Sequence, residues 1–370
     1  MRSMTLLILL SLLGPTALAD VHNSRQHDFK TVTLLEDLAH PWSIAFLPGG
    51  DWLITERPGQ LRHVQNGKLI ETPVTGTPDV NVDNQAGLLD VVLHPDFADN
   101  QYVYLTYAKA CNTGGNTTAV GRGVWNDGAL EDFTELYEAD ACEPGGRHHG
   151  SRIVFDDHNY MYVSVGDRGV QDKAQDPSNN IGSILRLHDD GSIPTDNPFV
   201  GKDGHDANWT YGNRNPQGMA IHPAGEIWAN EHGPMGGDEL NVIKKGANYG
   251  WPAITYGIDY DGSIISNETE KDGMMQPLKQ WTPSIAPSGM AFYSGDAFPD
   301  WQGDVFVGAL AHTHLSRVRF DGHAEVEEEK LMDNSIGRVR DVRVGPDGLV
   351  YILTDSPKGQ LVRLEPADHE

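Results

Sequence analysis

The sequence predicts an all-β fold, a β-propeller of six strand units with long inter-strand loops. The chain is rich in turn-forming residues, with 41 glycines and 22 prolines, and its apolar runs are short. No segment with helical periodicity is long enough to build a βαβ fold. Strand units that recur loosely along a chain, separated by turns, are typical of propellers. An array of β-sandwiches is the alternative architecture.

Each repeated unit has a turn containing Gly or Asp, a short apolar strand, a polar loop and a second short strand. The first unit runs from the turn Pro48–Asp51 into WLITE and then QLRHV. A strand of the same kind, QYVYLTYA, begins at Gln101. Unequal spacing between units indicates long loops inserted into some blades. The other four units begin at the turns 157–159, 223–225, 302–304 and 346–348.

The N-terminus has the features of a signal peptide. Arg2 supplies a positive charge, Leu6–Leu13 is almost entirely apolar, and Ala17–Ala19 is a small-residue cleavage site. We therefore expect residues 1–19 to be removed after Ala19 and residues 20–370 to form a single β-propeller domain. The apolar run is too short to span a bilayer, so we expect a periplasmic or secreted protein without membrane insertion.

The net charge and the cysteine content exclude several classes of function. The net charge of −26 argues against binding to nucleic acid or to anionic membranes, and it is consistent with cation binding. The two cysteines, Cys111 and Cys142, permit one disulfide in an exported chain, with two free thiols as the alternative. Neither cysteine lies in a metal-binding or CxxC pattern, which argues against zinc and thiol redox chemistry.

The densest group of polar residues lies between Tyr211 and Pro252, in loops on either side of one short predicted strand. Before the strand, an arginine guanidinium and two side-chain amides supply hydrogen-bond donors that match a planar, oxygen-rich anion. A Gly-Pro turn with two carboxylates after it suits a hard cation such as calcium. Ordinary turn residues are the alternative interpretation. The residues are Arg214, Asn215 and Gln217 before the strand, then Gly233, Pro234, Asp238 and Glu239, followed by Tyr249.

A candidate general base lies in the motif HHGSR, which His148 opens. A group that removes a hydroxyl proton should titrate near the working pH, as histidine does. Asp167, at the next strand end in VGDRG, is suited to hold that histidine in one tautomer. Two alternatives stay open, because His148 could be a solvated loop histidine and His149 could be the base in its place.

A series of longer motifs extends over nearly all of the chain after its N-terminal segment, and together they resemble the soluble pyrroloquinoline-quinone (PQQ)-dependent sugar dehydrogenases. This group is the glucose/sorbosone dehydrogenase family, and the similarity is greatest to its periplasmic aldose sugar dehydrogenases. In order, the motifs are HPWSIAFLPGG, NQAGLLDVVLHPDF, HHGSRIVFDD, VSVGDRG, ILRLHDDGSIPTDNPF, RNPQG, EHGPMGGDELN, NYGWP, APSGMAFY and RVRDVRVGPDGLVYILTD.

The resemblance implies a six-bladed β-propeller and makes residues 20–370 the catalytic domain. It implies that the protein oxidises aldose sugars at the anomeric carbon to lactones, using PQQ and Ca²⁺, and passes electrons to an external acceptor. His148 would take the hydroxyl proton, Asp167 would orient it, and Arg214 would stabilise the charge that develops on the quinone. The cofactor-binding residues would be Gln85, Arg214, Asn215, Gln217, Tyr260, Ser284, Ala311, Arg338 and Arg340.

By the same resemblance, the carbonyls of Gly233 and Pro234 would hold a catalytic calcium ion. Glu239 and the backbone of Tyr249 would hold a structural calcium ion. One position departs from the pattern, because some family members have a lysine where this chain has Ala311. Either His312 or His314 would then have to replace the lost cofactor contact, or the cofactor would bind more weakly.

Two other functions remain open at this point. A calcium-dependent propeller lactonase would need acidic and amide ligands in the channel and no quinone, and the RNPQG and RVR motifs argue against it. A non-catalytic extracellular binding propeller is the other candidate, since fold does not fix function. The base, arginine and amides argue against that candidate. Both a monomer and a homodimer are compatible with the sequence.

Overall fold

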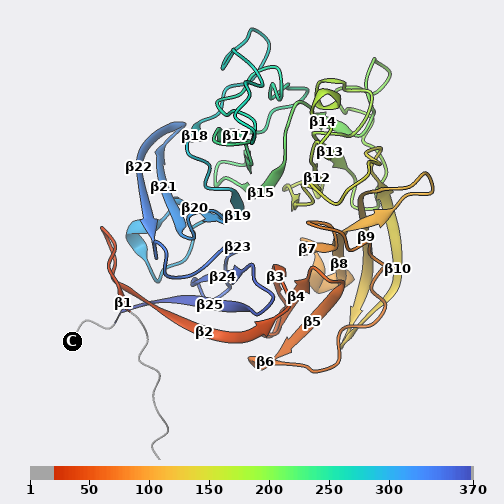
Figure 1. Ribbon diagram of the computed structural model, residues 1–370. Helices are drawn as coiled ribbons and strands as arrows, with labels where there is room; N and C mark the ends of the chain where they lie inside the picture. The colour runs from red at the N-terminus through yellow and green to blue at the C-terminus, as the bar shows by residue number, and fades with distance from the viewer. Residues whose placement is uncertain (1–20, 368–370) are drawn as a thin grey trace, which may run out of the picture.

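The computed structural model describes residues 21–367 and confirms the six-bladed β-propeller. Six antiparallel sheets are arranged in a ring about a central axis, and we call the region around this axis the channel (Figure 1). The predicted signal peptide, residues 1–19, lies outside the described residues. Within the described range, no helix is long and apolar enough to cross a membrane.

Most of the regular structure is β-strand, and each blade takes its strands from consecutive segments of the chain. Blades one to three are β3 (Pro41–Phe46), β4 (Trp52–Glu56), β5 (Gln60–Gln65), β6 (Lys68–Leu69); β7 (Leu88–Leu93), β8 (Tyr102–Ala110), β9 (Asn116–Asn126), β10 (Ala129–Glu138); β11 (Ile153–Phe155), β12 (Met161–Val165), β13 (Ser183–Leu187), β14 (Asn208–Thr210). Blades four to six are β15 (Pro216–Ile221), β16 (Ile227–Glu231), β17 (Asp238–Val242), β18 (Lys279–Trp281); β19 (Pro287–Phe292), β20 (Val305–Ala309), β21 (Leu315–Asp321), β22 (Ala324–Leu331); β23 (Val339–Val344), β24 (Val350–Thr354), β25 (Gly359–Pro366), β2 (Phe29–Leu38), β1 (Val21–His22). The short helices are α1 (Phe97–Asn100), η1 (Gln171–Gln175) and η2 (Pro299–Trp301).

The sixth blade is built from both ends of the chain. Strand β2 pairs antiparallel with β25, with Val32 opposite Arg363. Figure 1 shows the red N-terminal strand lying beside the blue C-terminal strand. The pairing closes the ring, so the first and last blades are held together by backbone hydrogen bonds.

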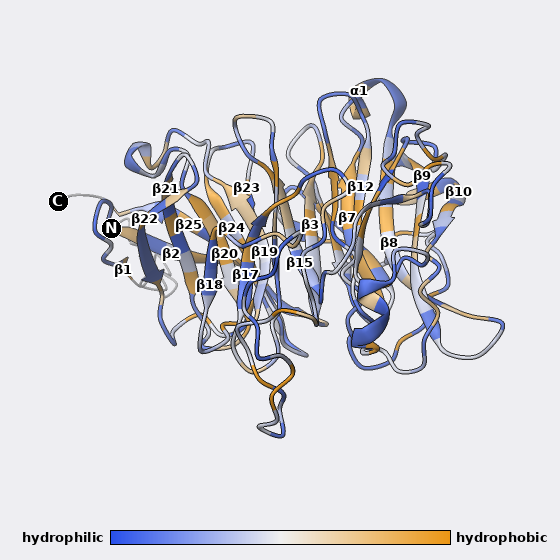
Figure 2. Ribbon diagram, turned by 90° about the horizontal axis from the view of Figure 1, so that it is seen from above, coloured by the Kyte–Doolittle hydropathy of each residue, from blue (hydrophilic) through white to orange (hydrophobic). Residues whose placement is uncertain are grey.

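Buried apolar side chains form one cluster at each junction between neighbouring blades. Trp228 lies fully buried between blades four and five, and Trp301 lies fully buried between blades five and six. The apolar stretches run along the strands, whereas the connecting loops are largely hydrophilic (Figure 2). This packing makes a rigid ring on which the loops can hold functional side chains.

Register shifts on the innermost strands direct side chains toward the channel. In five blades, the pairing of the innermost strand with its neighbour shifts near the start of the innermost strand. Trp42, Gln217 and Arg340 are each the second residue of such a strand, and all three line one cavity. Bulges of this kind re-aim side chains, so the fold gathers these residues where the innermost strands begin.

A buried charge network lies one residue further along two of these innermost strands, β7 and β23. Arg152 pairs with Asp90 at 3.0 Å and with Asp341 at 3.1 Å. Arg343 pairs with the same two carboxylates, at 3.1 Å and 2.9 Å. Asp90 and Asp341 are each the third residue of their innermost strand. We call these four residues the channel floor.

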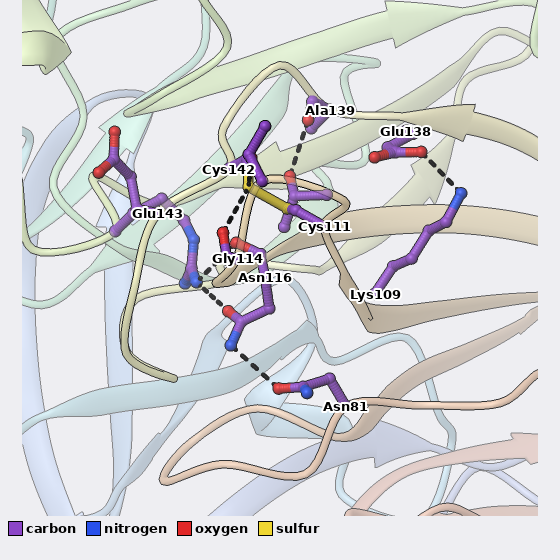
Figure 3. Close-up of a disulfide and its surroundings, with 12 residues drawn as sticks. Asn81, Lys109, Cys111, Gly114, Asn116, Glu138, Ala139, Cys142 and Glu143 are labelled. Carbon is purple, nitrogen blue, oxygen red and sulfur yellow. Dashed lines mark hydrogen bonds and ion pairs between the residues drawn. A yellow bond between two sulfur atoms is a disulfide. The ribbon is translucent and has the colours of Figure 1, made fainter.

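A disulfide joins Cys111 to Cys142, which confirms the predicted bond (Figure 3). The backbone of Asn116 exchanges two hydrogen bonds with Glu143, of 3.0 and 3.1 Å, one residue beyond Cys142. The buried Arg168 guanidinium donates to the Asn116 side chain and to the carbonyl of Arg147. These contacts anchor the segment that leads into His148.

Candidate active site

Two cavities lie on either side of the segment that contains the HHG motif. The first, of about 490 Å³, is lined by His149 and Gly150. The second, of about 570 Å³, is lined by His148 together with Asp167 and Arg214. The chain therefore presents adjacent residues to two different spaces. The other polar side chains lining the first cavity are His40, Arg57, Asn84, Gln85, Gln217, His232, Arg338, Arg340 and Asp355.

His148 and Asp167 form a hydrogen-bonded pair. His148 Nδ1 lies 2.6 Å from Asp167 Oδ1, and the two side chains are only 12% and 2% exposed. Burial lowers the pKa of His148, although Asp167 opposes this effect. Burial acts to raise the pKa of Asp167, but the hydrogen bond and charge of His148 outweigh it and the pKa is lowered. A charged Asp167 places the Nδ1 proton toward itself, so Nε2 of a neutral His148 is free to accept a proton.

His149 has a different environment. Its Nδ1 lies 3.1 Å from the Thr118 hydroxyl, and its Nε2 has no hydrogen-bond partner among the described residues. Burial lowers the pKa of His149 well below its usual value. Since only His148 has a carboxylate partner, the geometry favours His148 as the base, and it leaves a buried, unpaired nitrogen of His149 in the first cavity.

The RNPQG motif surrounds Gly150. Asn215 Oδ1 accepts a hydrogen bond from the Gly150 N–H at 3.1 Å, and Gln217 Nε2 donates to the Gly150 carbonyl at 3.2 Å. Gln217 Oε1 accepts from Arg340 at 2.9 Å. Arg214 Nε and Asn215 Nδ2 are buried and have no partner within residues 21–367. Unpaired buried donors are costly, so these two atoms point to a ligand that accepts hydrogen bonds.

Three basic side chains at the first cavity, those of His40, Arg338 and Arg340, converge on one carboxylate. Asp355 lies 3.0 Å from His40 Nδ1, 3.4 Å from Arg338 and 3.1 Å from Arg340. Burial alone would raise the pKa of Asp355, but Arg340 and the His40 hydrogen bond hold it well below its usual range. Arg57 also lines the cavity, and no carboxylate within the described chain pairs with it. The cavity therefore has a surplus of positive charge.

The remaining predicted cofactor contacts vary in position. Gln85 lines the first cavity, and its Oε1 accepts a hydrogen bond from the His148 N–H at 3.0 Å. Tyr260 lines the second cavity and is 70% exposed. The Ser284 hydroxyl donates to Asp238, and the Ala311 N–H donates to the Ile285 carbonyl at 2.9 Å. Ser284, Ala311, His312 and His314 are absent from the lining of both cavities.

The Gly-Pro turn has free acceptors. Neither the Gly233 nor the Pro234 carbonyl accepts a hydrogen bond from the described residues, and Pro234 lines the second cavity. The Gly233 N–H donates to Asp238 at 2.8 Å, which holds the turn in place. No three His, Cys, Asp or Glu side chains between residues 21 and 367 converge to hold a metal ion by themselves. The turn therefore suits a cation whose other ligands are backbone or ligand oxygens.

Two neighbouring carboxylates lack a counter-ion. Burial raises the pKa of Glu231 to about 7. Burial and the neighbouring Glu231 raise the pKa of Glu239 to about 8. Neither forms an ion pair with a basic side chain of the described chain, although Asn241 donates to Glu239 at 3.0 Å. Two such groups suit a bound cation. Tyr249 is buried, and its hydroxyl donates to the Val242 carbonyl at 2.6 Å, with no hydrogen bond to Glu239.

The sequence analysis missed several residues of the site. Arg57, His232 and Asp355 each follow directly after the second strand of a blade, β4, β16 and β24. Asp167 occupies a similar place after β12. Aligning the repeated units by their second strands would have found this set. Trp251 entered the sequence analysis only within the motif NYGWP, and Glu231 only as the first residue of the motif EHGPMGGDELN.

Comparison with known proteins gives long matches. The family profile described as glucose/sorbosone dehydrogenase matches residues 38–363. The aldose sugar dehydrogenase YliI of Escherichia coli (strain K12) is 43% identical over 343 residues, covering 90% of this chain and 92% of that protein. The apo-form of the soluble aldose sugar dehydrogenase from Escherichia coli has a TM-score of 0.89 and 42% identity, covering 92% of this chain and 100% of that chain. The PQQ-bound aldose sugar dehydrogenase from Streptomyces coelicolor has a TM-score of 0.75 and 27% identity, covering 95% and 99%.

Proposed function

The chain belongs to the glucose/sorbosone dehydrogenase family, and on that basis we propose that it oxidises aldose sugars at the anomeric carbon to lactones. PQQ and calcium are the proposed cofactors, and an external acceptor receives the electrons. The observation that carries the proposal is the His148–Asp167 pair beside a cation-rich cavity. The similarity to aldose sugar dehydrogenases, one of them PQQ-bound, supports it.

The first cavity fits a planar quinone with several carboxylates. Arg57, Arg338 and Arg340 supply positive charge, and Arg340 is held between Gln217 and Asp355. The unpaired donors of Arg214 and Asn215 would supply hydrogen bonds to quinone oxygens, and Asn215 already holds Gly150 in the wall of this cavity. When bound, PQQ would supply the hydride acceptor, and calcium on the Gly-Pro turn would polarise its carbonyl.

Oxidation of the sugar removes a proton from the anomeric hydroxyl and a hydride from C1, which leaves a C1=O bond. His148 Nε2 accepts the proton, and Asp167 stabilises the imidazolium that forms. The Arg214 guanidinium lines the same cavity as His148 and would stabilise negative charge that develops on the acceptor. The sugar would bind in the second cavity, which is lined by Trp251, Tyr260 and Ile265. Tyr260, predicted as a cofactor contact, would then contact the sugar.

The same proposal places the protein in the periplasm or outside the cell. The disulfide between Cys111 and Cys142 supports an oxidising compartment. The signal-peptide features of residues 1–19 support export.

The test is dye-linked oxidation of a panel of aldoses by purified protein, with and without PQQ and calcium. We expect activity only when both are added, and we expect it to collapse in His148→Gln. Oxidation that needs neither addition would contradict the proposed cofactors. A folded protein that oxidises no aldose in their presence would contradict the proposed function.

A further inference from the structure

The indole of Trp251 reaches the proton-accepting pair from another blade. Trp251 follows β17 in the fourth blade, whereas Asp167 follows β12 in the third. Its Nε1–H donates to Asp167 Oδ2 at 2.8 Å, while Asp167 Oδ1 holds His148 at 2.6 Å. The Gly169 N–H also donates to Oδ1, at 2.8 Å. Each oxygen of the carboxylate therefore has a fixed donor, and Trp251 is the partner of the second oxygen.

Trp251 is held firmly in place. Its N–H donates to the Gly212 carbonyl at 2.8 Å, and its carbonyl accepts from Gln175 at 2.8 Å. Gln175 and Asn248 exchange two side-chain hydrogen bonds, of 3.0 and 2.9 Å. The side chain is buried at the wall of the second cavity. Since both sides of its backbone are anchored, the indole keeps one orientation toward Asp167.

The ring of Trp251 also lies beside the guanidinium of Arg214. The guanidinium carbon of Arg214 is 5.2 Å from the centre of the Trp251 ring, within the range of a cation–π contact. The backbone of Arg214 is also tied to Asp167, because its carbonyl accepts from the Asp167 N–H at 2.7 Å. One aromatic side chain thus contacts both Asp167 and Arg214.

We propose that Trp251 is a positioning residue for proton transfer, whose indole N–H fixes the Asp167 carboxylate and through it the tautomer and ring orientation of His148. This role rests on the proposed dehydrogenase function. Without the N–H, Asp167 can rotate away from the alignment in which Nε2 of His148 faces the sugar. Misalignment of this kind slows the chemical step more than it weakens sugar binding.

The N–H also affects the acidity of His148. An indole donor takes up part of the negative charge of Asp167. When it is lost, the charge acts more strongly on the imidazolium, and a smaller side chain also admits water to the buried pair. Both effects raise the pKa of His148. The groups that face His148 are Asp167, which raises its pKa, and Arg214 and Arg147, which lower it. The imidazoles of His149 and His232 also lie near, and burial lowers the pKa of each well below its usual value.

Two variants at position 251 and one control variant distinguish the effect of the indole N–H from that of the ring. Trp251→Phe removes the N–H and part of the ring, and benzothienylalanine at position 251 keeps the bicyclic shape but has no N–H. Trp281→Phe is the matched control, because Trp281 is equally buried and donates to Glu328 at the same distance, 2.8 Å, outside both cavities. Thermal unfolding and circular dichroism establish that each variant folds.

Two readouts decide the matter. The first is the pH profile of kcat and KM with PQQ and calcium present. The second is the pKa of His148 in cofactor-free protein, followed by NMR of labelled histidines and assigned with His148→Gln. For both position-251 variants we expect kcat to fall about tenfold. KM should change little in the benzothienylalanine variant, which keeps the ring in the cavity wall, whereas Trp251→Phe removes part of that wall and should also raise KM. We also expect the pKa of His148 to rise, and Trp281→Phe to match the wild type.

An unchanged or lower pKa of His148 together with an unchanged kcat in the benzothienylalanine variant would overturn the proposal. The NMR readout does not require turnover. If the wild type oxidises no aldose, the dehydrogenase function fails, yet the pKa of His148 still shows whether Trp251 acts on the pair.

Discussion

The channel floor and the site above it balance charge in different ways. In the floor, two guanidiniums and two carboxylates are all paired with one another at 2.9–3.1 Å, and three of the four side chains are almost completely buried. Arg152, Arg343, Asp90 and Asp341 thus form a closed set. A network whose charges are mutually neutralised needs no ligand to be stable.

The site lacks that balance. Arg57, Arg338 and Arg340 share the first cavity with a single carboxylate, Asp355. Near the Gly-Pro turn the imbalance is reversed, because Glu231 and Glu239 have no basic partner among the described residues. The difference separates a part of the propeller whose charges are balanced from a part whose charges are not. The proposed anion and cation would neutralise the second part.

The largest expected effect is on catalysis. His148→Gln removes the proton acceptor and keeps similar volume, so we expect kcat to fall about a thousandfold. Stability should change little, since His148 contributes to the site and not to the packing of the ring. Steady-state kinetics and thermal unfolding measure the two effects. If the His148→Gln variant were active, His148 would not be the base. The variant His149→Gln is the control for the neighbouring imidazole.

A substitution in the channel floor should instead affect stability. Arg152→Met leaves Asp90 and Asp341 with one guanidinium in place of two, so we expect a loss of about 3–5 kcal/mol in the free energy of unfolding. Denaturant titration measures this loss. Arg343→Met, at a more exposed side chain, should cost less. If Arg152→Met were as stable as the wild type, the ion pairs of the channel floor would not stabilise the fold, which would contradict this prediction.

The disulfide should have an intermediate effect. Replacing both Cys111 and Cys142 by Ser opens a loop of sequence separation 31, for which we expect a loss of about 3 kcal/mol. Because the bridge anchors the segment leading into His148, kcat should also fall modestly, by about two- to threefold. Denaturant titration and kinetics at a temperature where the variant is folded test both. Full activity with lowered stability would limit the bridge to a structural role.

The smallest effect concerns the unpaired carboxylates. The folded-state pKa values of Glu231 and Glu239, about 7 and about 8, exceed the ordinary value of 4.5. Their contribution to stability is therefore present below pH 4.5 and is lost as pH rises through 7 and 8. We expect the melting temperature of calcium-free protein to fall by a few degrees between pH 5 and 8, beyond the decline in calcium-loaded protein. The melting temperature is measured from pH 5 to 8 for the wild type with chelator, for the wild type with calcium and for Glu239→Gln. If the melting temperature falls equally with pH in all three, the prediction is contradicted.

The sequence was sufficient for features that depend on local patterns. Repeated turns and strands predicted the propeller, and short motifs predicted the hydrogen bond between His148 and Asp167. The roles of these two residues and of the amides around Gly150 stay predictions. The sequence was insufficient where a role depends on a contact between blades. Trp251 gains its role from Asp167, a residue of another blade. Ser284 was predicted near the cofactor, and no sequence pattern indicated that its hydroxyl hydrogen-bonds to Asp238.

A binding titration tests most directly the claim that the site is completed by external charges. PQQ is added to cofactor-free protein with calcium or with chelator, and binding is followed by absorbance and intrinsic fluorescence. We predict one PQQ per chain, bound only with calcium, with affinity reduced about tenfold by Arg340→Gln and unchanged by Arg363→Gln. No binding to the folded wild type in calcium, or equal binding with and without the ion, would contradict the account.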